Sequence, residues 1–358
     1  MESEELFKEF IKKVVEGFDL PSEEAEKAME EIMNGSATQS QIGAFLTALR
    51  MKGETIDEIV AFAKVMRRFC YKIKPRVDGK LIDTCGTGGD KLKTFNISTT
   101  AAFIIAGANI PVAKHGNRSV TSKSGSADVL EELGLRLNIT PKEVEKIIEN
   151  EGIGFMFAPV FHEAMKNVAQ TRKEIGIRTV FNVLGPLANP AEANTQLLGV
   201  YDKSLVKPLA HVLKKLGCQE AMITHGLDGI DEVSTIGKTL IAWLKNGEVN
   251  TMILSPKKLG VKKAKPEDIA GLDPKGNAEI IFKILNGVYS MNEPKMEIAL
   301  INAAAGLILG GKADNFSYGL ELARETIENG CAYKKLKRLI KASGGDLSKL
   351  EELELKYA

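Results

Sequence analysis

The sequence predicts an α/β fold in which a small helical domain precedes a large α/β domain with a mostly parallel central sheet and added antiparallel strands. Apolar residues recur at helical spacing from residue 6 to about 71, and short β-like runs alternate with helical segments after Pro75. Two later β-like runs flank Asn246-Gly247, a strong hairpin signal. Two domains are expected because 358 residues exceed the roughly 250 to 300 at which one core stops growing.

The opening block is predicted to be helical, with almost no strand. Phe7 and Phe10 begin a series of apolar residues spaced by three and four. Ser22 is predicted as an N-cap because two glutamates follow it in the first turn. Thr55 and Glu58 form a T-x-x-E capping box that predicts the start of another helix.

The strands of the second part are predicted from short apolar runs. One intervening helix is well marked, with Thr140 as N-cap, Pro141 at the first helical position and Glu143 completing a capping box. Residues 175–190 contain two prolines and two glycines and form either a connection or a return to the helical domain. The predicted parallel strands cover residues 80–84, 110–113, 153–157, 197–201 and 221–225, and the hairpin strands cover 239–244 and 249–254.

Composition narrows the class of protein. The chain has 48 Lys and Arg against 47 Asp and Glu, so no global basic field suggests a nucleic-acid partner. The four cysteines lack the spacing of a zinc site or a disulfide framework, which favours a reducing cytoplasm. The first residues are acidic, and no apolar run approaches the ~20 residues of a membrane span. We therefore expect a soluble cytoplasmic protein without a membrane partner.

A glycine-rich run, Gly86-Thr87-Gly88-Gly89-Asp90, follows the first predicted strand and suggests an anion site. It matches neither the dinucleotide-binding GxGxxG pattern nor the P-loop. Three glycines in four positions allow a ligand to approach the backbone closely, although a tight turn without a ligand has the same signature. The next helix is expected to have Ser98 or Thr99 as N-cap, and a hydroxyl there could also contact phosphate or Mg²⁺.

A second run, from Lys114 to Ser126, places three cations among hydroxyls and glycines. These cations are Lys114, Arg118 and Lys123. Cations, hydroxyls and free backbone N–H groups together favour a pyrophosphate cradle, with a solvated basic loop as the alternative.

The other candidate residues are weaker signals when taken alone. The adjacent Asp231 and Glu232 suit Mg²⁺, although acidic pairs are usually just solvated. Arg172, in a helical segment, could grip a carboxylate or be an ordinary surface residue. The four histidines lack metal-ligand spacing, which leaves His115 and His162 as candidate substrate contacts.

Together these motifs resemble the anthranilate phosphoribosyltransferase family, within the nucleoside phosphorylase-like phosphoribosyltransferases. The resemblance spans nearly the whole chain in order and spacing. It is based on residues 41–46 (QIGAFL), 86–90 (GTGGD), 96–99 (NIST), 114–118 (KHGNR), 178–182 (RTVFN), 185–190 (GPLANP) and 231–232 (DE).

The resemblance implies two domains: a small helical domain of residues 1–72, completed by about 165–190, and a large α/β domain of residues 73–164 and 191–358. It implies a homodimer formed through the helical domain. The implied reaction joins anthranilate to 5-phosphoribosyl 1-diphosphate (PRPP), giving N-(5-phosphoribosyl)anthranilate and pyrophosphate in tryptophan biosynthesis, with Mg²⁺ as cofactor.

The resemblance also assigns roles to individual residues. Lys114, Asn117 and Arg172 are implied to be catalytic, and Ser98, Asp231 and Glu232 to bind the metal. Asp228, in the variable turn before that acidic pair, is either an extra ligand or a turn residue. Anthranilate is implied to contact Gly86, His115, Asn117, Arg172 and Pro186. PRPP is implied to contact Gly86, Gly89, Asp90, Thr94, Asn96, Ile97, Ser98, Thr99, Lys114, His115, Gly116, Asn117, Arg118, Ser119, Val120, Thr121, Ser122 and Ser126.

Two rival functions remain open at this point. A pyrimidine nucleoside phosphorylase-like enzyme would share the architecture, but different loop patterns would be expected. A non-catalytic nucleic-acid-binding relative would need a basic stripe and broken anthranilate contacts, whereas the charge is balanced and Asn117 and Arg172 are present.

Overall fold

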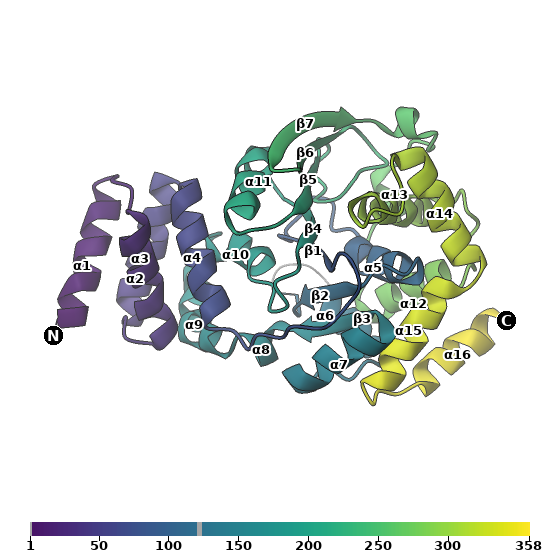
Figure 1. The fold of residues 1–358 in the computed structure, drawn as a ribbon, viewed down its shortest axis with the longest axis horizontal. Helices are drawn as coiled ribbons and strands as arrows, with labels where there is room; N and C mark the ends of the chain where they lie inside the picture. Colours follow the sequence, from purple (N-terminus) through teal and green to yellow (C-terminus); the bar gives the residue numbers. More distant parts are fainter. Residues whose placement is uncertain (1, 120–123) are drawn as a thin grey trace.

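The computed structural model describes residues 2–119 and 124–358, and the predicted fold class is confirmed. At one end of the molecule lie α1 (Glu2–Val15), α2 (Ser22–Asn34), α3 (Gln39–Lys52) and α4 (Ile56–Arg68), as Figure 1 shows. Of two later helices, α9 (Lys166–Ile175) packs against α2 and α3, and α10 (Phe181–Leu187) packs against α4. Residues 175–190 therefore return the chain to the helical part.

The helix starts test the capping predictions directly. The Thr55–Glu58 capping box of α4 is confirmed, and so is the Thr140–Glu143 box of α7 (Pro141–Glu151). The prediction of Ser22 as an N-cap is wrong, because α2 begins at Ser22 itself and Pro21 occupies the cap without a side-chain bond.

In the described part of the chain, seven strands form one sheet in the order β3-β2-β1-β4-β5-β6-β7. The first five are parallel: β1 (Ile82–Gly86), β2 (Val112–Gly116), β3 (Ile153–Phe157), β4 (Thr195–Gly199) and β5 (Glu220–Gly226). Strands β6 (Thr239–Lys245) and β7 (Glu248–Leu254) add an antiparallel hairpin. At its turn Asn246 and Gly247 have φ values of 52° and 77°, as the Asn-Gly signal predicted.

Several predicted strands are displaced along the chain by about two residues, and β1 begins at Ile82 instead of residue 80. Lys80 has a polar role before the strand: its ammonium pairs with Glu220 and donates to the carbonyl of Leu309 at 2.7 Å. The β-like run therefore included a residue that anchors the strand without joining the sheet.

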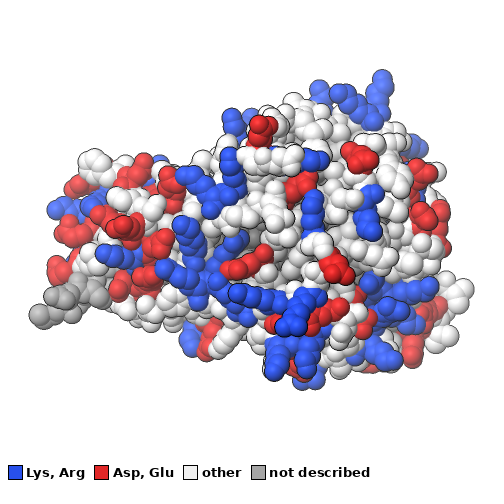
Figure 2. Space-filling model, in the orientation of Figure 1, with Lys and Arg blue, Asp and Glu red and all other residues white. Residues whose placement is uncertain are grey.

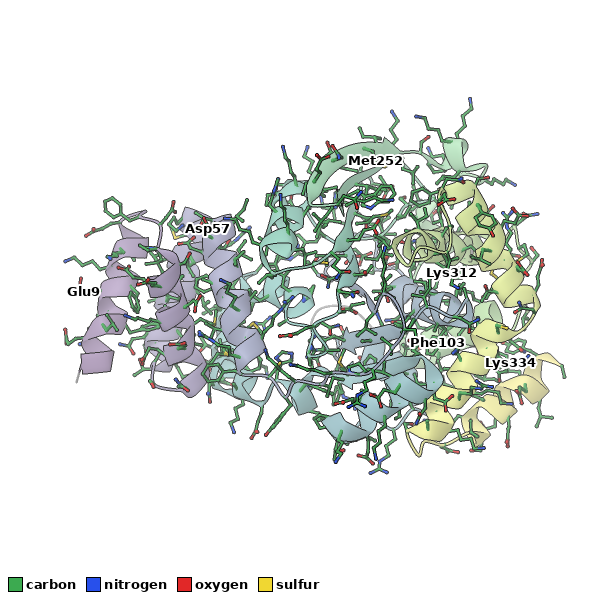
Figure 3. The ribbon with its side chains drawn as sticks, in the orientation of Figure 1. Glu9, Asp57, Phe103, Met252, Lys312 and Lys334 are labelled. Carbon is green, nitrogen blue, oxygen red and sulfur yellow. The ribbon has the colours of Figure 1, made fainter. Side chains whose placement is uncertain are left out.

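Helices cover both faces of the sheet. On one face α5 (Ile97–Gly107) and α13 (Pro294–Leu309) are apolar on nearly all sides and almost entirely buried, as expected of core helices. Phe103 of α5, labelled in Figure 3, is 1% exposed. On the other face α11 (Val206–Lys215) contacts β5 and α4. The remaining helices are α6 (Ser126–Glu132), α8 (Ala158–Phe161), α12 (Pro274–Leu285), α14 (Phe316–Glu328), α15 (Cys331–Ala342) and α16 (Ser348–Tyr357).

Among the described residues, the buried apolar side chains form two clusters: one contains α5, α13 and consecutive residues of β3, and the other contains α11. The cluster on the α11 face also includes the interior of the helical part, such as Phe45 and Phe62. A continuous apolar core thus joins the helical part to that face of the sheet. Among the described residues, no helix combines the length and apolar character of a membrane span.

Candidate active site

The strand order places a topological switch point between β1 and β4, where a ligand crevice is expected. From β1 the chain proceeds to β2 and β3 on one side, whereas β4 and β5 lie on the other side. In open α/β sheets, ligands bind outside the carboxyl ends of the strands at such a switch point. The loops that follow β1, β2 and β5 contain the two glycine-rich runs and the acidic pair, so these predicted residues meet at this edge (Figure 1), whereas Arg172 lies on α9 and Pro186 on α10.

The first glycine-rich loop is attached to the acidic turn behind it. Gly88 and Gly89 have positive φ values of 66° and 78°. The Gly88 N–H donates to Asp231 Oδ2 at 3.1 Å, and the Thr87 N–H donates to the carbonyl of Gly199 at 2.9 Å. These glycines are therefore needed for the backbone path of the loop itself.

The acidic pair is buried, and burial disfavours the charged form of both carboxyl groups. Asp231 is 9% and Glu232 is 8% exposed. Burial raises the pKa of Asp231 to about 7, with a further upward effect from Asp90. Burial and then Asp231 raise the pKa of Glu232 well above its usual range, while Lys114 opposes that rise. Among the described residues, no three His, Cys, Asp or Glu side chains form a metal-binding group.

Glu232 also explains the start of α5. The sequence predicted Ser98 or Thr99 as the N-cap, but this is wrong: α5 begins at Ile97, and Ser98 and Thr99 lie in its first turn. The Ser98 N–H instead donates to Glu232 Oε1 at 3.1 Å. A carboxylate more than a hundred residues away thus satisfies the helix N-terminus, where negative charge is favourable.

Lys114 belongs to β2 instead of the loop after it, and it is 4% exposed. Its ammonium donates to the carbonyl of Thr84 on β1. Burial lowers the pKa of Lys114, whereas Asp83, Cys85 and Glu232 oppose that change. A cation is therefore fixed below the crevice, next to the acidic pair.

The second glycine-rich loop is organised by Asp128, which the sequence analysis did not single out. Asp128 Oδ2 accepts the N–H groups of Ser119 at 3.0 Å and Gly125 at 2.9 Å. Arg118 forms ion pairs with Asp128 at 3.1 Å and Glu131 at 2.7 Å. The guanidinium thus ties the loop to α6. A G-x-x-D capping pattern at residues 125–128 is the sequence signal that could have identified Asp128.

One side-chain amide connects the start of α5 to the second loop: Asn96 Nδ2 donates to the carbonyl of Ser124 at 3.2 Å. Within the second loop, Ser126 Oγ donates to the carbonyl of Asn117 at 3.4 Å. Asp90 Oδ2 accepts from the Thr94 N–H at 3.2 Å within the first loop. The predicted contacts Val120, Thr121 and Ser122, together with Lys123, lie outside the described residues.

Arg172 lies on α9, in the last turn, as predicted. Its guanidinium faces the ring of Phe181 at 5.4 Å. Burial lowers the pKa of Arg172, and among the described residues no carboxylate forms an ion pair with it. Arg172 is therefore a partly buried cation without an ion-pair partner in the described chain.

Two buried histidines, His115 and His162, lie next to each other. The rings of His115 and His162 are 4.9 Å apart, and the Nε2 atom of each is buried without a hydrogen-bond partner among the described residues. Burial and then His162 lower the pKa of His115 well below its usual range, and burial lowers that of His162 to about 4. Pro186 lies within α10 and its carbonyl accepts from Gln196 Nε2 at 2.6 Å.

Asp228 and Arg178 both form hydrogen bonds in or next to the turns of the site. Asp228 Oδ2 accepts from Ser234 Oγ at 2.6 Å and its Oδ1 from the Ile230 N–H at 3.3 Å, so both oxygens are used within the turn. Arg178 Nη2 donates to the carbonyl of Gly89 at 2.6 Å. Arg178 was part of a quoted motif but was not predicted as a site residue.

Figure 2 shows acidic and basic side chains mixed over one face of the molecule, with Lys and Arg gathered where the helical part meets the α/β part. This agrees with the balanced net charge of +1 and with a local, not a global, requirement for positive charge. Recognition of an anion is therefore expected from individual side chains and loop N–H groups.

Two family models match the chain. The helical bundle domain of the glycosyl transferase family matches residues 8–70, and the a/b domain of that family matches residues 78–333. The chain is similar to the anthranilate phosphoribosyltransferase of Methanosarcina acetivorans, at 51% identity, covering 90% of this chain and 86% of the relative. The enzyme of that name from Methanocorpusculum labreanum is also 51% identical, covering 94% of this chain and 98% of the relative.

Solved structures that are similar to this chain are also anthranilate phosphoribosyltransferases. The crystal structure of anthranilate phosphoribosyltransferase from Thermus thermophilus has a TM-score of 0.88 and 37% identity, covering 93% of this chain and 99% of that one. The enzyme from Saccharomyces cerevisiae, in complex with PRPP and Mg, has a TM-score of 0.87 and 31% identity, covering 94% and 98%.

Proposed function

The chain belongs to the anthranilate phosphoribosyltransferase family, and from this premise we propose that it transfers the 5-phosphoribosyl group of PRPP to the amine of anthranilate. The products are N-(5-phosphoribosyl)anthranilate and pyrophosphate, in a step of tryptophan biosynthesis. The observation that carries the proposal is the meeting, at one sheet edge, of two glycine-rich loops and a buried acidic pair.

PRPP is proposed to lie across the carboxyl ends of β1 and β2. Backbone N–H groups of both loops, the first turn of α5 and the Lys114 ammonium supply donors for phosphate oxygens. PRPP is proposed to contact the same residues that the family resemblance implies, including the loop residues outside the described part of the chain. Arg118 is already paired with Asp128 and Glu131, so its contact with PRPP would require those pairs to rearrange.

Mg²⁺ is proposed to bind Asp231 and Glu232, with Ser98 nearby. The fit is supported by the raised pKa values of both carboxyl groups, because burial and repulsion from neighbouring carboxylates, Asp90 for Asp231 and Asp231 for Glu232, are the conditions that a bound cation relieves. Mg²⁺ typically takes one or two carboxylates together with substrate phosphates. When bound, it would neutralise charge on the pyrophosphate group.

Anthranilate is proposed to bind with its carboxylate on Arg172, whose guanidinium has no ion-pair partner among the described residues. Asn117 would orient the amine, and Gly86, His115 and Pro186 would border the ring. His115 and His162 are neutral because burial lowers both pKa values, so they add no charge that would compete with Arg172.

The chain's residues then act by alignment and electrostatics. The amine nitrogen forms a bond to the anomeric carbon of ribose as the bond from that carbon to pyrophosphate oxygen breaks, and the amine loses a proton. Lys114 and the loop N–H groups stabilise the negative charge on pyrophosphate. Arg172 and Asn117 hold the amine in line with the breaking bond. No protein nucleophile is required.

A homodimer formed through the helical part is proposed as well. Its support is a groove of about 530 Å³ between α1, α3 and α9, bordered by Val15 and Met51, which are 67% and 84% exposed. Light scattering of the purified protein tests it, and Met51→Asp should shift the dimer toward monomer. A monomeric wild type would contradict the proposal.

The domain division at residues 72–73, 164–165 and 190–191 also remains a proposal. It is supported by the family matches to residues 8–70 and 78–333 and by the packing of α9 and α10 on the helical part. A cytoplasmic location is proposed because the cysteines of the described chain are free thiols, which suits a reducing compartment.

Anthranilate consumption by the purified protein tests the proposed reaction, measured with PRPP and Mg²⁺ together and with each omitted. Consumption only in the complete mixture, with one pyrophosphate released per anthranilate, is the expected result. Absence of consumption, together with phosphate-dependent nucleoside cleavage or salt-dependent binding of single-stranded DNA, would overturn the proposal.

A further inference from the structure

Arg178 connects two parts of the chain that are distant in sequence. It lies between α9 and α10, the two helices that pack against the helical part. Its Nη2 atom donates to the carbonyl of Gly89, 89 residues earlier, at 2.6 Å. One side chain therefore runs from the segment between these helices to the first glycine-rich loop.

A second contact sets the direction of the guanidinium. Its central carbon lies 4.0 Å from the centre of the Tyr201 ring, just beyond β4. The Tyr201 N–H donates to Thr87 Oγ1 at 3.0 Å, so Tyr201 is itself bonded to the same loop. Stacking on an aromatic face limits the rotamers of a long exposed side chain and adds cation–π attraction.

The loop needs such restraint because of its glycines. Gly88 and Gly89 have positive φ values, and glycine has more conformational freedom to lose on ordering than any other residue. The bond from Arg178 reaches the loop at Gly89, near its end, whereas Thr87 is held at its start by Gly199. A loop ordered before the ligand arrives binds more tightly than one that must be ordered on binding.

A guanidinium has five N–H donors, and among the described residues only one bond, to Gly89, is made by Arg178. The other N–H donors of Arg178 therefore have no acceptor in the described part of the chain.

We propose that Arg178 is a positioning residue that orders residues 86–90 in the conformation that binds the pyrophosphate group of PRPP. The inference rests on the proposed function for the identity of the ligand. The tether itself, the hydrogen bond from Arg178 to the Gly89 carbonyl, does not depend on which ligand binds. The tether also links ordering of the loop to the position of the segment between α9 and α10.

The test compares Arg178→Ala, Arg178→Lys and a matched control, Lys173→Ala, which removes an exposed cation five residues away. In the ligand-free protein, hydrogen exchange of residues 86–91 is expected to rise in Arg178→Ala and to stay unchanged in the control. Calorimetric affinity for PRPP with Mg²⁺ is expected to fall about 10- to 100-fold, in line with losing a bond to a charged donor.

Kinetics separate positioning from general damage. Arg178→Ala is expected to raise KM for PRPP, with kcat and KM for anthranilate within about threefold of wild type. Arg178→Lys should recover part of the affinity, because an ammonium can still donate to the Gly89 carbonyl but stacks less well on Tyr201.

Unchanged exchange in residues 86–91, or PRPP affinity within twofold of wild type, would overturn the proposal. So would an equal loss of affinity for both substrates accompanied by a lower Tm, since that pattern denotes a merely structural residue. Failure of the proposed function would be distinct: the wild type itself would not consume anthranilate, while the exchange measurement would still report on the tether.

Discussion

Replacing Arg172 with alanine is expected to weaken anthranilate binding selectively. The guanidinium is partly buried against Phe181, burial lowers its pKa, and no carboxylate of the described chain forms an ion pair with it. A bound carboxylate would supply the missing partner. Losing one charge-assisted hydrogen bond costs roughly 1.5 to 3 kcal/mol, which corresponds to about a 10- to 150-fold loss of affinity.

The assay is KM for anthranilate together with the calorimetric Kd for PRPP, measured for the wild type, Arg172→Ala and Arg172→Lys. The lysine variant keeps the charge but loses the forked geometry, so its anthranilate KM should lie between those of the other two proteins. PRPP affinity serves as the internal control and should stay within twofold. Equal loss for both ligands would refute the assignment of Arg172 to the carboxylate.

Three further changes test other parts of the site. Asp231→Asn combined with Glu232→Gln should abolish the dependence of PRPP binding on Mg²⁺ in a calorimetric titration, while thermal unfolding checks that the fold persists; an unchanged titration rules out the metal role. For His162 the folded pKa of about 4 lies below its usual 6.5 because burial disfavours the charged ring. Protonation of His162 therefore favours the unfolded chain, and the free energy of unfolding should fall as pH decreases from 6.5 toward 4. His162→Gln should therefore remove up to about 3 kcal/mol of that pH dependence in urea unfolding, and identical pH profiles for both proteins would contradict the shift. Gly199→Ala would drive its methyl group into the backbone oxygen of Asp231, which should cost about 3 kcal/mol, whereas Gly185→Ala, with open space around it, should leave Tm unchanged or raise it; equal Tm values for the two variants would disprove the packing argument.

Local signals in the sequence predicted local structure well. The Thr140–Glu143 box and the Asn246-Gly247 turn depend only on neighbouring residues, and both were confirmed. The Ser98 or Thr99 cap was wrong for the complementary reason, because the acceptor at that helix start is Glu232, 134 residues away. Capping rules consider the nearby chain and cannot identify a distant carboxylate that replaces the local cap.

The same limit applies to the site. Motif order was enough to indicate which residues gather at the sheet edge, since parallel strands bring their carboxyl ends together. It could not indicate that Lys114 is buried against the backbone of β1 or that Asp128 holds the second loop. Both depend on strand pairing and loop path, which are tertiary properties.

The glycines of the GTGGD run are required for two different structural reasons, which the motif alone does not distinguish. A Cβ on Gly86 would lie 2.8 Å from Asp231 Oδ2, whereas Gly88 and Gly89 are required by their positive φ values. The GTGGD run therefore combines two demands: close approach of the acidic turn at its first position and an unusual backbone path further on. Gly199 belongs to no motif, yet it faces the same turn from β4. The turn bearing Asp231 and Glu232 thus lies across the switch point between β1 and β4 because glycine ends both strands, and this packing accounts for the glycine at position 86 independently of the proposed phosphate contact.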